Sequence, residues 1–226
     1  ANFGVGAVMA MNSAEPSIIN CTMVDNLVTD QSGYGGAVSC GYDHLADNTM
    51  AELYGFYTYI LLKNCILWDN MAMNGPQAAV GDPLSDYNQS CTIELTYVNI
   101  QGGMEDVFEG KPKGNPWAYP SGLIMDKEPM FVSVSTSELP EDQTFYLSHE
   151  QSVQLGTSPC VDAGSGDVSD LSSLLGNVDI TTSTDHMLDT GTVDIGYHVL
   201  ADPNSVKTYL LRTSVYIADI LPNGTI

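Results

Sequence analysis

The sequence predicts an all-β fold of the β-solenoid class, in which the chain coils and its strands stack. The main observation is a cassette at 20–26, NCTMVDN, that returns as NCILWDN at 64–70. The spacing of 64 − 20 = 44 residues is interpreted as about two coils. A degenerate third copy is expected at 90–95. A Gly/Ala-rich motif alternates with the cassettes. Its copies are Gly4–Val8, Gly35–Val38 and Gln77–Val80.

Composition supports a many-stranded, turn-rich protein. Charged residues make up 15% of the 226, well below the usual quarter, while hydrophobic residues make up 43%. The net charge of −22 argues against nucleic-acid partners, because phosphate binding needs clustered Lys and Arg. Such an acidic surface favours divalent cations, calcium above all. No run of 18 apolar residues is present, so no transmembrane segment is expected.

Each repeated position has a structural expectation. Residues 17–24, 35–40, 57–67 and 91–100 are rich in β-branched and aromatic residues and are predicted to be strands. Gly35-Gly36 predicts a sharp turn. Asn26 and Asn70 close the two cassettes and are expected to form a hydrogen-bonded ladder between coils. Residues 43–53 are expected to form a loop or short helix between coils.

The five cysteines, at 21, 40, 65, 91 and 160, argue against a full disulfide framework because their number is odd. Cys21, Cys65 and Cys91 occupy the same slot of the three cassette copies. We therefore expect them to stack as one column of buried thiols. No Cys-x-x-Cys or Cys-His spacing indicates a metal site.

Several later blocks resemble a recurring C-terminal coil of bacterial right-handed parallel β-helix proteins. They are residues 96–103 with 122–132, then 145–147 with 156–164, and last 189–198, in the order found in that family. The resemblance implies a right-handed parallel β-helix over residues 1–200, near the C-terminal end of a longer secreted or cell-surface protein. This chain departs from the family pattern at 127–129 and in a long insertion at 104–121. The family is similar to pectate lyases in shape, but many members have no demonstrated reaction.

The domain organisation follows from this resemblance. Residues 101–122 are expected to leave the solenoid wall as an excursion loop, rich in Gly and Pro. Residues 201–226 are expected to form a strand-like tail, either a cap on the solenoid or the start of another domain. An uncovered solenoid end exposes unpaired backbone groups and favours assembly with another chain.

Two sets of residues are candidate ligand sites. Tyr57 and Tyr59 alternate on one strand, and Trp117 and Tyr119 lie in the excursion, so all four could present aromatic faces to a sugar, although the strand pair could equally pack in the core. For calcium, two carboxylate clusters are candidates, with ordinary acidic turns as the alternative. They are Asp162, Asp167 and Asp170, and then Asp185, Asp189 and Asp194.

Catalytic patterns are weaker. A lyase of this fold needs an Arg or Lys base, but Arg212 lies outside the resembling region and Lys63 fits a solvated strand position. A glycosidase needs two carboxylates about 5–9.5 Å apart. Asp25 and Asp69, if two coils apart, would be separated by about 9.6 Å, yet an Asp before a turn Asn also satisfies backbone groups. His44, His149, His186 and His198 form no triad pattern.

The sequence therefore predicts a non-catalytic extracellular or cell-surface structural or adhesion protein. Its partners would be other protein subunits or an extracellular glycan, with a homo-oligomer or filament as one form of assembly. The alternative is a polysaccharide lyase or glycoside hydrolase acting on an extracellular polysaccharide.

Overall fold

The computed structural model describes residues 6–11, 13–29, 33–41, 56–81, 89–110, 117–132 and 145–201. The first ten strands are β1 (Val8–Met11), β2 (Ser17–Ile19), β3 (Thr22–Val24), β4 (Val38–Gly41), β5 (Phe56–Trp68), β6 (Ala78–Val80), β7 (Gln89–Ile100), β8 (Phe108–Glu109), β9 (Trp117–Pro120) and β10 (Ile124–Met125). The others are β11 (Phe131–Val132), β12 (Tyr146–Leu147), β13 (Ile180–Thr181) and β14 (Val199–Leu200). The helices are η1 (Gly103–Asp106), η2 (Glu150–Ser152) and α2 (Val168–Leu174).

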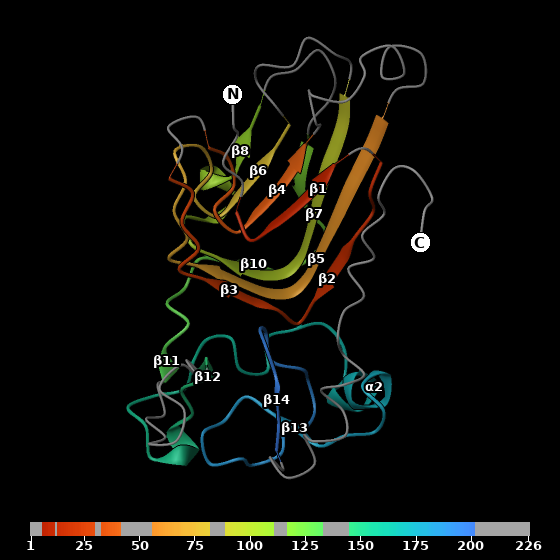
Figure 1. The fold of residues 1–226 in the computed structure, drawn as a ribbon. Helices are drawn as coiled ribbons and strands as arrows, with labels where there is room; N and C mark the ends of the chain where they lie inside the picture. Colours follow the sequence, from red (N-terminus) through yellow and green to blue (C-terminus); the bar gives the residue numbers. More distant parts are fainter. Residues whose placement is uncertain are drawn as a thin grey trace, which may run out of the picture.

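Two parallel sheets make up the larger part of the molecule (Figure 1). Strands β1, β4, β6 and β8 form a four-stranded sheet in that order. A six-stranded sheet has the order β10-β7-β5-β2, with β3 also beside β5 and β9 also beside β7. As far as β10, the chain passes back and forth between the two sheets and adds strands beside those already there. The prediction of an all-β fold with parallel strands is confirmed.

The 44-residue spacing corresponds to neighbouring strands, so the interpretation as two coils was wrong. Thr22 of β3 pairs with Ile66 of β5, and Ile19 of β2 pairs with Lys63. One passage is this long because the chain visits β4 in the opposite sheet and passes through long connections before it returns. Asp25 and Asp69 therefore directly follow two adjacent strands, which lie about 4.8 Å apart, and not strands separated by two coils.

The third cassette copy lies at 97–103 and not at 90–95. Strand β7 pairs with β5 at an offset of 98 − 65 = 33 residues, which sets Val98 against Cys65 and Cys91 against Thr58. The predicted column of three thiols is therefore wrong. Cys21 and Cys65 are neighbours, whereas the Cys91 thiol meets Cys40 from the facing sheet. The match at Ser90-Cys91 is a coincidence of residue types, because the third copy has Val98 at the cysteine position.

Sharp bends mark the stacked cassettes. Their first positions, Asn20, Asn64 and Tyr97, have φ of 50°, 52° and 54°. At the sixth positions, Asp25, Asp69 and Gly102 have φ of 57°, 53° and 79°. Asn, Asp and Gly adopt this left-handed conformation more readily than other residues. The first bends give β5 and β7 their elbows (Figure 1), which divide the outer face of the six-stranded sheet into two parts.

The predicted asparagine ladder is confirmed. The Asn70 Oδ1 atom accepts hydrogen bonds from the Asn26 amide nitrogen Nδ2 (2.7 Å) and from the Asn26 backbone (3.1 Å). The Asn70 Nδ2 group donates to Met23 O, Trp68 O and Gln77 Oε1. Gln77 continues the ladder by donating to Gln101 Oε1 at 3.0 Å. These polar side chains satisfy one another where the chain leaves the sheet, so their burial is tolerated.

The excursion predicted at 101–122 instead contributes to both sheets. Residues 108–109 form β8 beside β6, and residues 117–120 form β9 beside β7. The sequence of this segment looks loop-like because its strands are short and are separated by Gly and Pro residues. Residues 111–116, between them, lie outside the described part.

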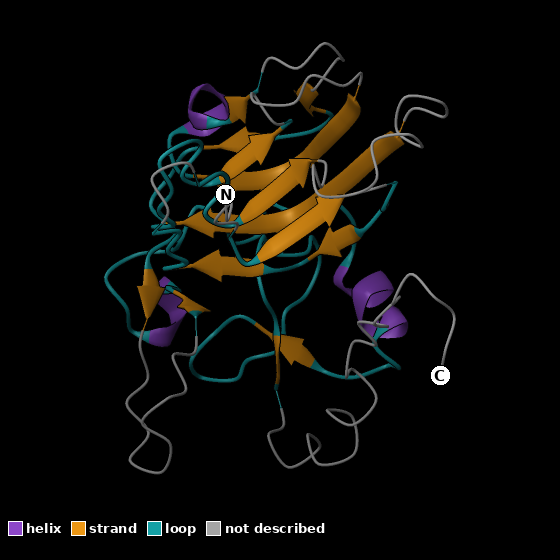
Figure 2. Cartoon of the chain, turned by 45° about the horizontal axis from the view of Figure 1, so that its top comes forward, coloured by secondary structure: helices purple, strands orange, loops and turns teal. Residues whose placement is uncertain are grey.

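Residues 131–132 and 145–200 form a smaller module below the sheets (Figure 2). Parallel pairing among the described strands ends at Met125, and this module contains two antiparallel pairs, β11-β12 and β13-β14, with α2. It therefore differs from the predicted continuation of parallel coils to residue 200. The predictions for 43–53 and, apart from Ala201, for 201–226 lie outside the described residues.

Two apolar clusters hold these parts together. One fills the space between the parallel sheets and includes Ile60, Leu62, Ile93 and Leu95. The other joins the sheet to the smaller module, where Ile66 and Trp68 pack with Leu147, Cys160 and Ile195. Beyond the first bend the outer face of the six-stranded sheet is therefore covered. Before that bend the outer face is left to solvent.

Candidate functional site

Alternation along three neighbouring strands places the four predicted aromatic residues on one face. In β5, Thr58 and Ile60 are buried, so Tyr57 and Tyr59 point outward, and in β9 the buried Ala118 separates two outward rings. The pairing aligns Tyr59 with Thr92 and Thr92 with Trp117. We call Tyr57, Tyr59, Trp117 and Tyr119 the aromatic platform.

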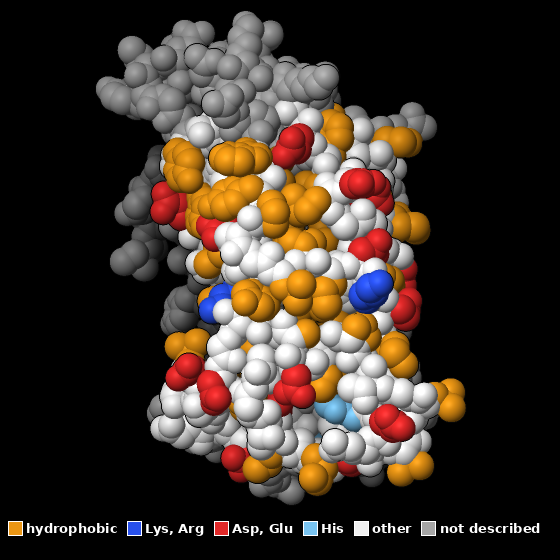
Figure 3. All heavy atoms as spheres, turned by 180° about the vertical axis from the view of Figure 1, so that it is seen from behind, with side chains coloured by type: hydrophobic (Ala, Val, Ile, Leu, Met, Phe, Trp, Pro, Cys, Tyr) orange, Lys and Arg blue, Asp and Glu red, His pale blue; other side chains and the backbone are white. Residues whose placement is uncertain are grey.

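The platform is open to solvent. Trp117 is 60% exposed and Tyr57 is 46% exposed. The Trp117 and Tyr119 ring centroids are 5.1 Å apart, and those of Tyr57 and Tyr59 are 6.3 Å apart with nearly parallel planes. Figure 3 shows hydrophobic side chains gathered on one face of the molecule with acidic groups among them. Exposed aromatic rings on a sheet are costly unless a ligand or partner covers them, so this face is a candidate binding surface.

A carboxylate lies at the centre of the platform. Glu94 Oε2 accepts hydrogen bonds from the hydroxyl groups of Tyr119 (2.6 Å) and Tyr59. Hydrogen bonds from Ser121, Tyr119 and Tyr59 lower the pKa of Glu94 below its ordinary value. Burial and the hydrogen bond to Glu94 raise the pKa of Tyr59. At neutral pH the centre is therefore an ionised acceptor held by two phenol donors.

Sequence reasoning did not single out Glu94. A signal was available, because Glu94 alternates with the apolar Ile93 and Leu95 in a predicted strand and so had to face outward. What the sequence could not provide was the register between β5, β7 and β9. That register brings Glu94 between two tyrosines that are 119 − 59 = 60 residues apart.

The predicted calcium ligands are only partly brought together. Among the described residues, one group offers three ligand atoms within 4.8 Å of one another, and it consists of Asp189, Asp194 and His198. Asp167 instead caps α2, where its Oδ1 accepts from the Ser169 backbone at 2.8 Å. Asp170 lies in the first turn of α2. Asp185 accepts from the hydroxyl groups of Ser152 and Ser183, both at 2.8 Å.

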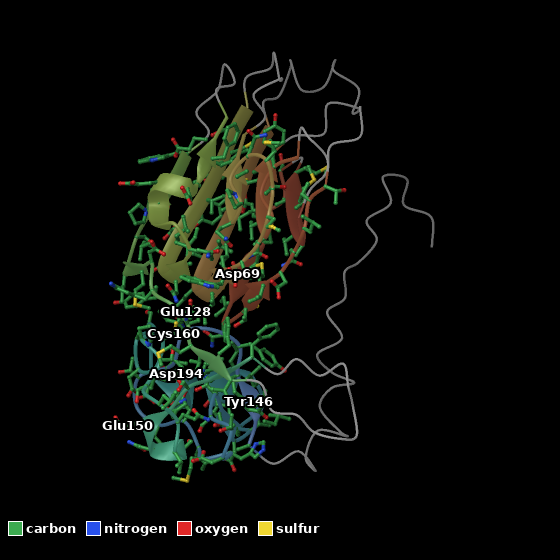
Figure 4. The ribbon with its side chains drawn as sticks, turned by 90° about the vertical axis from the view of Figure 1, so that its left-hand side faces the viewer. Asp69, Glu128, Tyr146, Glu150, Cys160 and Asp194 are labelled. Carbon is green, nitrogen blue, oxygen red and sulfur yellow. The ribbon has the colours of Figure 1, made fainter. Side chains whose placement is uncertain are left out.

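The Asp194 carboxylate is enclosed in the smaller module (Figure 4). Its Oδ1 accepts from the Asp162 backbone at 2.6 Å, and its Oδ2 accepts from the Thr182 hydroxyl. His198 Nε2 lies 3.1 Å from Asp189 Oδ2. Burial, and then the nearby charge of Asp189, raise the pKa of Asp194. Both Asp194 oxygens are thus engaged within the protein, and a His ligand suits transition metals better than calcium.

A cleft of about 740 Å³ borders this cluster, with Asp189 in its lining. Its lining includes His149, Ser152, Ser183, Asp185 and Thr190. The Ser152 and Ser183 hydroxyl oxygens lie 2.7 Å apart, and each lies 2.8 Å from an oxygen of the Asp185 carboxylate. Thr182, which also lines the cleft, has its hydroxyl oxygen 3.0 Å from His149 Nε2, and this hydroxyl group donates to the Asp194 carboxylate.

In comparisons with known proteins, no family model matches this sequence, and neither a curated protein nor a solved structure matches it. Within the described residues, no helix has the length and apolar character needed to cross a membrane. The resemblance to bacterial parallel β-helix proteins therefore depends on the sequence blocks at 96–132, 145–164 and 189–198 alone.

Proposed function

We propose that this chain is a non-catalytic, extracellular or cell-surface protein that binds glycans on the aromatic platform. The observation that carries the proposal is the grouping of four aromatic rings from two strands of one sheet around the ionised Glu94. The passage of the chain between two parallel sheets, with cassettes in register, supports a right-handed parallel β-helix as its framework.

The chemistry of the platform suits a sugar. Aromatic faces pack on the apolar C–H faces of pyranose rings, and a carboxylate accepts hydrogen bonds from sugar hydroxyl groups. Lys63 and Lys127 are the only basic side chains of Lys or Arg type in the described part, whereas the chain has 28 acidic residues. This balance favours neutral glycans over uronates, because an acidic polymer would be repelled.

The same geometry argues against catalysis on this face. The lowered pKa of Glu94 removes it as a general acid near neutral pH, since such an acid must hold its proton. A second carboxylate, Glu109, accepts a hydrogen bond from the Ala118 backbone at 3.0 Å, and it makes no hydrogen bond to the described rings of the platform. A lyase or glycosidase is the alternative function, and the test below includes it.

The first test replaces the most exposed ring. Trp117→Ala should weaken binding to insoluble neutral polysaccharides, such as cellulose or chitin, at least tenfold in a pull-down isotherm, because stacking on this ring is lost. Tyr197→Ala is the matched control, since Tyr197 is also exposed (52%) but lies in the smaller module. Equal binding by wild type and Trp117→Ala, or failure of wild type to bind any neutral glycan, would contradict the proposal. Release of soluble sugar by the wild type would support the enzymatic alternative.

The second test concerns the central carboxylate. Glu94→Gln keeps the shape but removes the charge that accepts the two tyrosine hydrogen bonds. We expect binding to fall about three- to tenfold, in line with the loss of one charge-assisted hydrogen bond. Wild-type binding should persist on acidification to below pH 4.5, because the pKa of Glu94 is lowered, and then decline as the carboxylate is protonated. A decline that begins at pH 6 would contradict the role assigned to Glu94.

A further inference from the structure

The geometry points to a second, independent site: Cys21 and Cys65 form a thiol pair that closes as a disulfide between neighbouring strands when the protein meets a small-molecule disulfide. This inference does not depend on glycan binding, since the pair lies in the sheet and away from the aromatic platform. It concerns a covalent link between successive passages of the chain.

The backbone places the two cysteines directly opposite each other. Ile19 pairs with Lys63 before them, and Thr22 pairs with Ile66 after them. The hydrogen bond from Ile66 N to Cys21 O, at 2.9 Å, fixes the alignment at the pair itself. Neighbouring strands lie about 4.8 Å apart. This spacing falls within the Cα separation of about 4.4–6.8 Å that disulfides span without backbone movement.

The two side chains point into the same apolar cluster. Cys65 belongs to the core between the sheets, and Cys21 packs against it from a partly exposed position. Their thiols are within hydrogen-bonding reach of each other. Cys21 Sγ also lies 3.3 Å from Ile19 O, and Cys65 Sγ lies 3.2 Å from Lys63 O. The two thiol groups are therefore neighbours in the reduced protein.

The pair is asymmetric in the way that thiol–disulfide exchange requires. The hydrogen bond from Cys65 lowers the pKa of Cys21 to about 7, whereas burial raises the pKa of Cys65. The Cys21 thiolate attacks one sulfur of the oxidant R–S–S–R, which forms a mixed disulfide and releases one thiolate. Cys65 then loses its proton to solvent and attacks the Cys21 sulfur, which expels the second thiolate. One small disulfide becomes two thiols, and the protein dithiol becomes a disulfide.

The other cysteines provide internal controls. Cys40 and Cys91 also have neighbouring thiols, but both are almost fully buried and they approach from facing sheets. The hydrogen bond with Cys91 and burial raise the pKa of Cys40. Burial raises the pKa of Cys160 to about 11. Cys40 and Cys160 lack both access and thiolate character, and Cys91 lacks access, so these thiols should not react in the folded protein.

The experiment exposes the folded, reduced full chain to glutathione disulfide at pH 7.5, then alkylates the remaining thiols in denaturant and maps the peptides by mass spectrometry. We expect one cross-linked peptide joining Cys21 to Cys65, with Cys40, Cys91 and Cys160 alkylated. The oxidised protein should melt about 5–10 °C higher than the reduced protein, and dithiothreitol should reverse the shift. Cys65→Ala should stop at a mixed disulfide between glutathione and Cys21.

Three outcomes would overturn the inference. They are full alkylation of Cys21 and Cys65 in wild-type protein after oxidation, a cross-link only between Cys40 and Cys91, and a cross-link formed only in denaturant. Because these are read from wild-type protein, a folding defect in Cys65→Ala cannot obscure the result.

Discussion

At the scale of single residues, hydrogen-bonding capacity decides where each acidic side chain is used. Asp167 caps a helix, Asp69 accepts from Gln101, and Asp194 is buried because two donors reach it. The sequence indicated that acids cluster at 162–170 and at 185–194 but not which of them share a site. His198 joins Asp189 and Asp194 because β14 returns to β13, and such a contact between separate strands leaves no local pattern.

The buried Asp194 leads to a prediction about stability and pH. Because its pKa is raised in the folded protein, its contribution to stability is fully present below the unfolded value near 3.9 and is lost as pH rises through the folded pKa. Asp194→Asn keeps an acceptor for the Asp162 backbone and removes the charge. We expect the free energy of unfolding of this variant, measured in urea, to exceed that of wild type by about 1 kcal/mol at pH 7 and to equal it at pH 3.5.

Asp170→Asn is the control for Asp194→Asn, since Asp170 is exposed in the first turn of α2. A loss of stability in Asp194→Asn at both pH values would show that the carboxylate contributes more through its hydrogen bonds than it costs through burial.

At the scale of elements, the turn motif could be predicted well and the register could not. Gly35 and Gly75 precede β4 and β6 by the same number of residues and have φ of +62° and +61°. The Gly-Gly signal at 35–36 indicated this turn correctly. By contrast, the alignment of β7 depends on connection lengths that vary from one passage to the next. The cassette copy at 97–103 was therefore missed, since only its bends and its apolar alternation persist.

Gly75 provides a direct test of the turn. A Cβ atom at Gly75 would lie 2.1 Å from Ala78 O in a left-handed backbone, so Gly75→Ala combines strain with a clash against backbone. We expect a loss of more than about 2 kcal/mol in the free energy of unfolding. Gly41→Ala is the matched control, because nothing lies within 4 Å of a Cβ there. Equal stability of the two variants in urea denaturation would contradict this account of the turn.

At the scale of the whole molecule, charge is the feature that composition predicted most directly. A net charge of −22 on 226 residues makes the folded chain repel itself, and added salt screens that repulsion. We expect the melting temperature to rise by several degrees between 10 mM and 300 mM NaCl. No change, or a fall, would show that self-repulsion is negligible in this fold.

The predicted calcium site can be tested by the same measurement of melting temperature. Because both Asp194 oxygens accept hydrogen bonds within the protein and His198 suits transition metals better, calcium chloride should raise the melting temperature no further than sodium chloride at equal ionic strength. A larger rise in calcium chloride that Asp194→Asn removes would instead support the predicted calcium cluster of Asp185, Asp189 and Asp194.

The bends have a consequence for what the chain tolerates. Successive bends are 64 − 20 = 44 residues apart and then 97 − 64 = 33 residues apart, yet their strands remain aligned. The two passages thus differ by eleven residues in length, and the bends remain aligned from strand to strand. Foreign peptides of similar length, inserted into these connections, should leave the pairing of the parallel strands unchanged. The fold is therefore suited to the display of grafted epitopes.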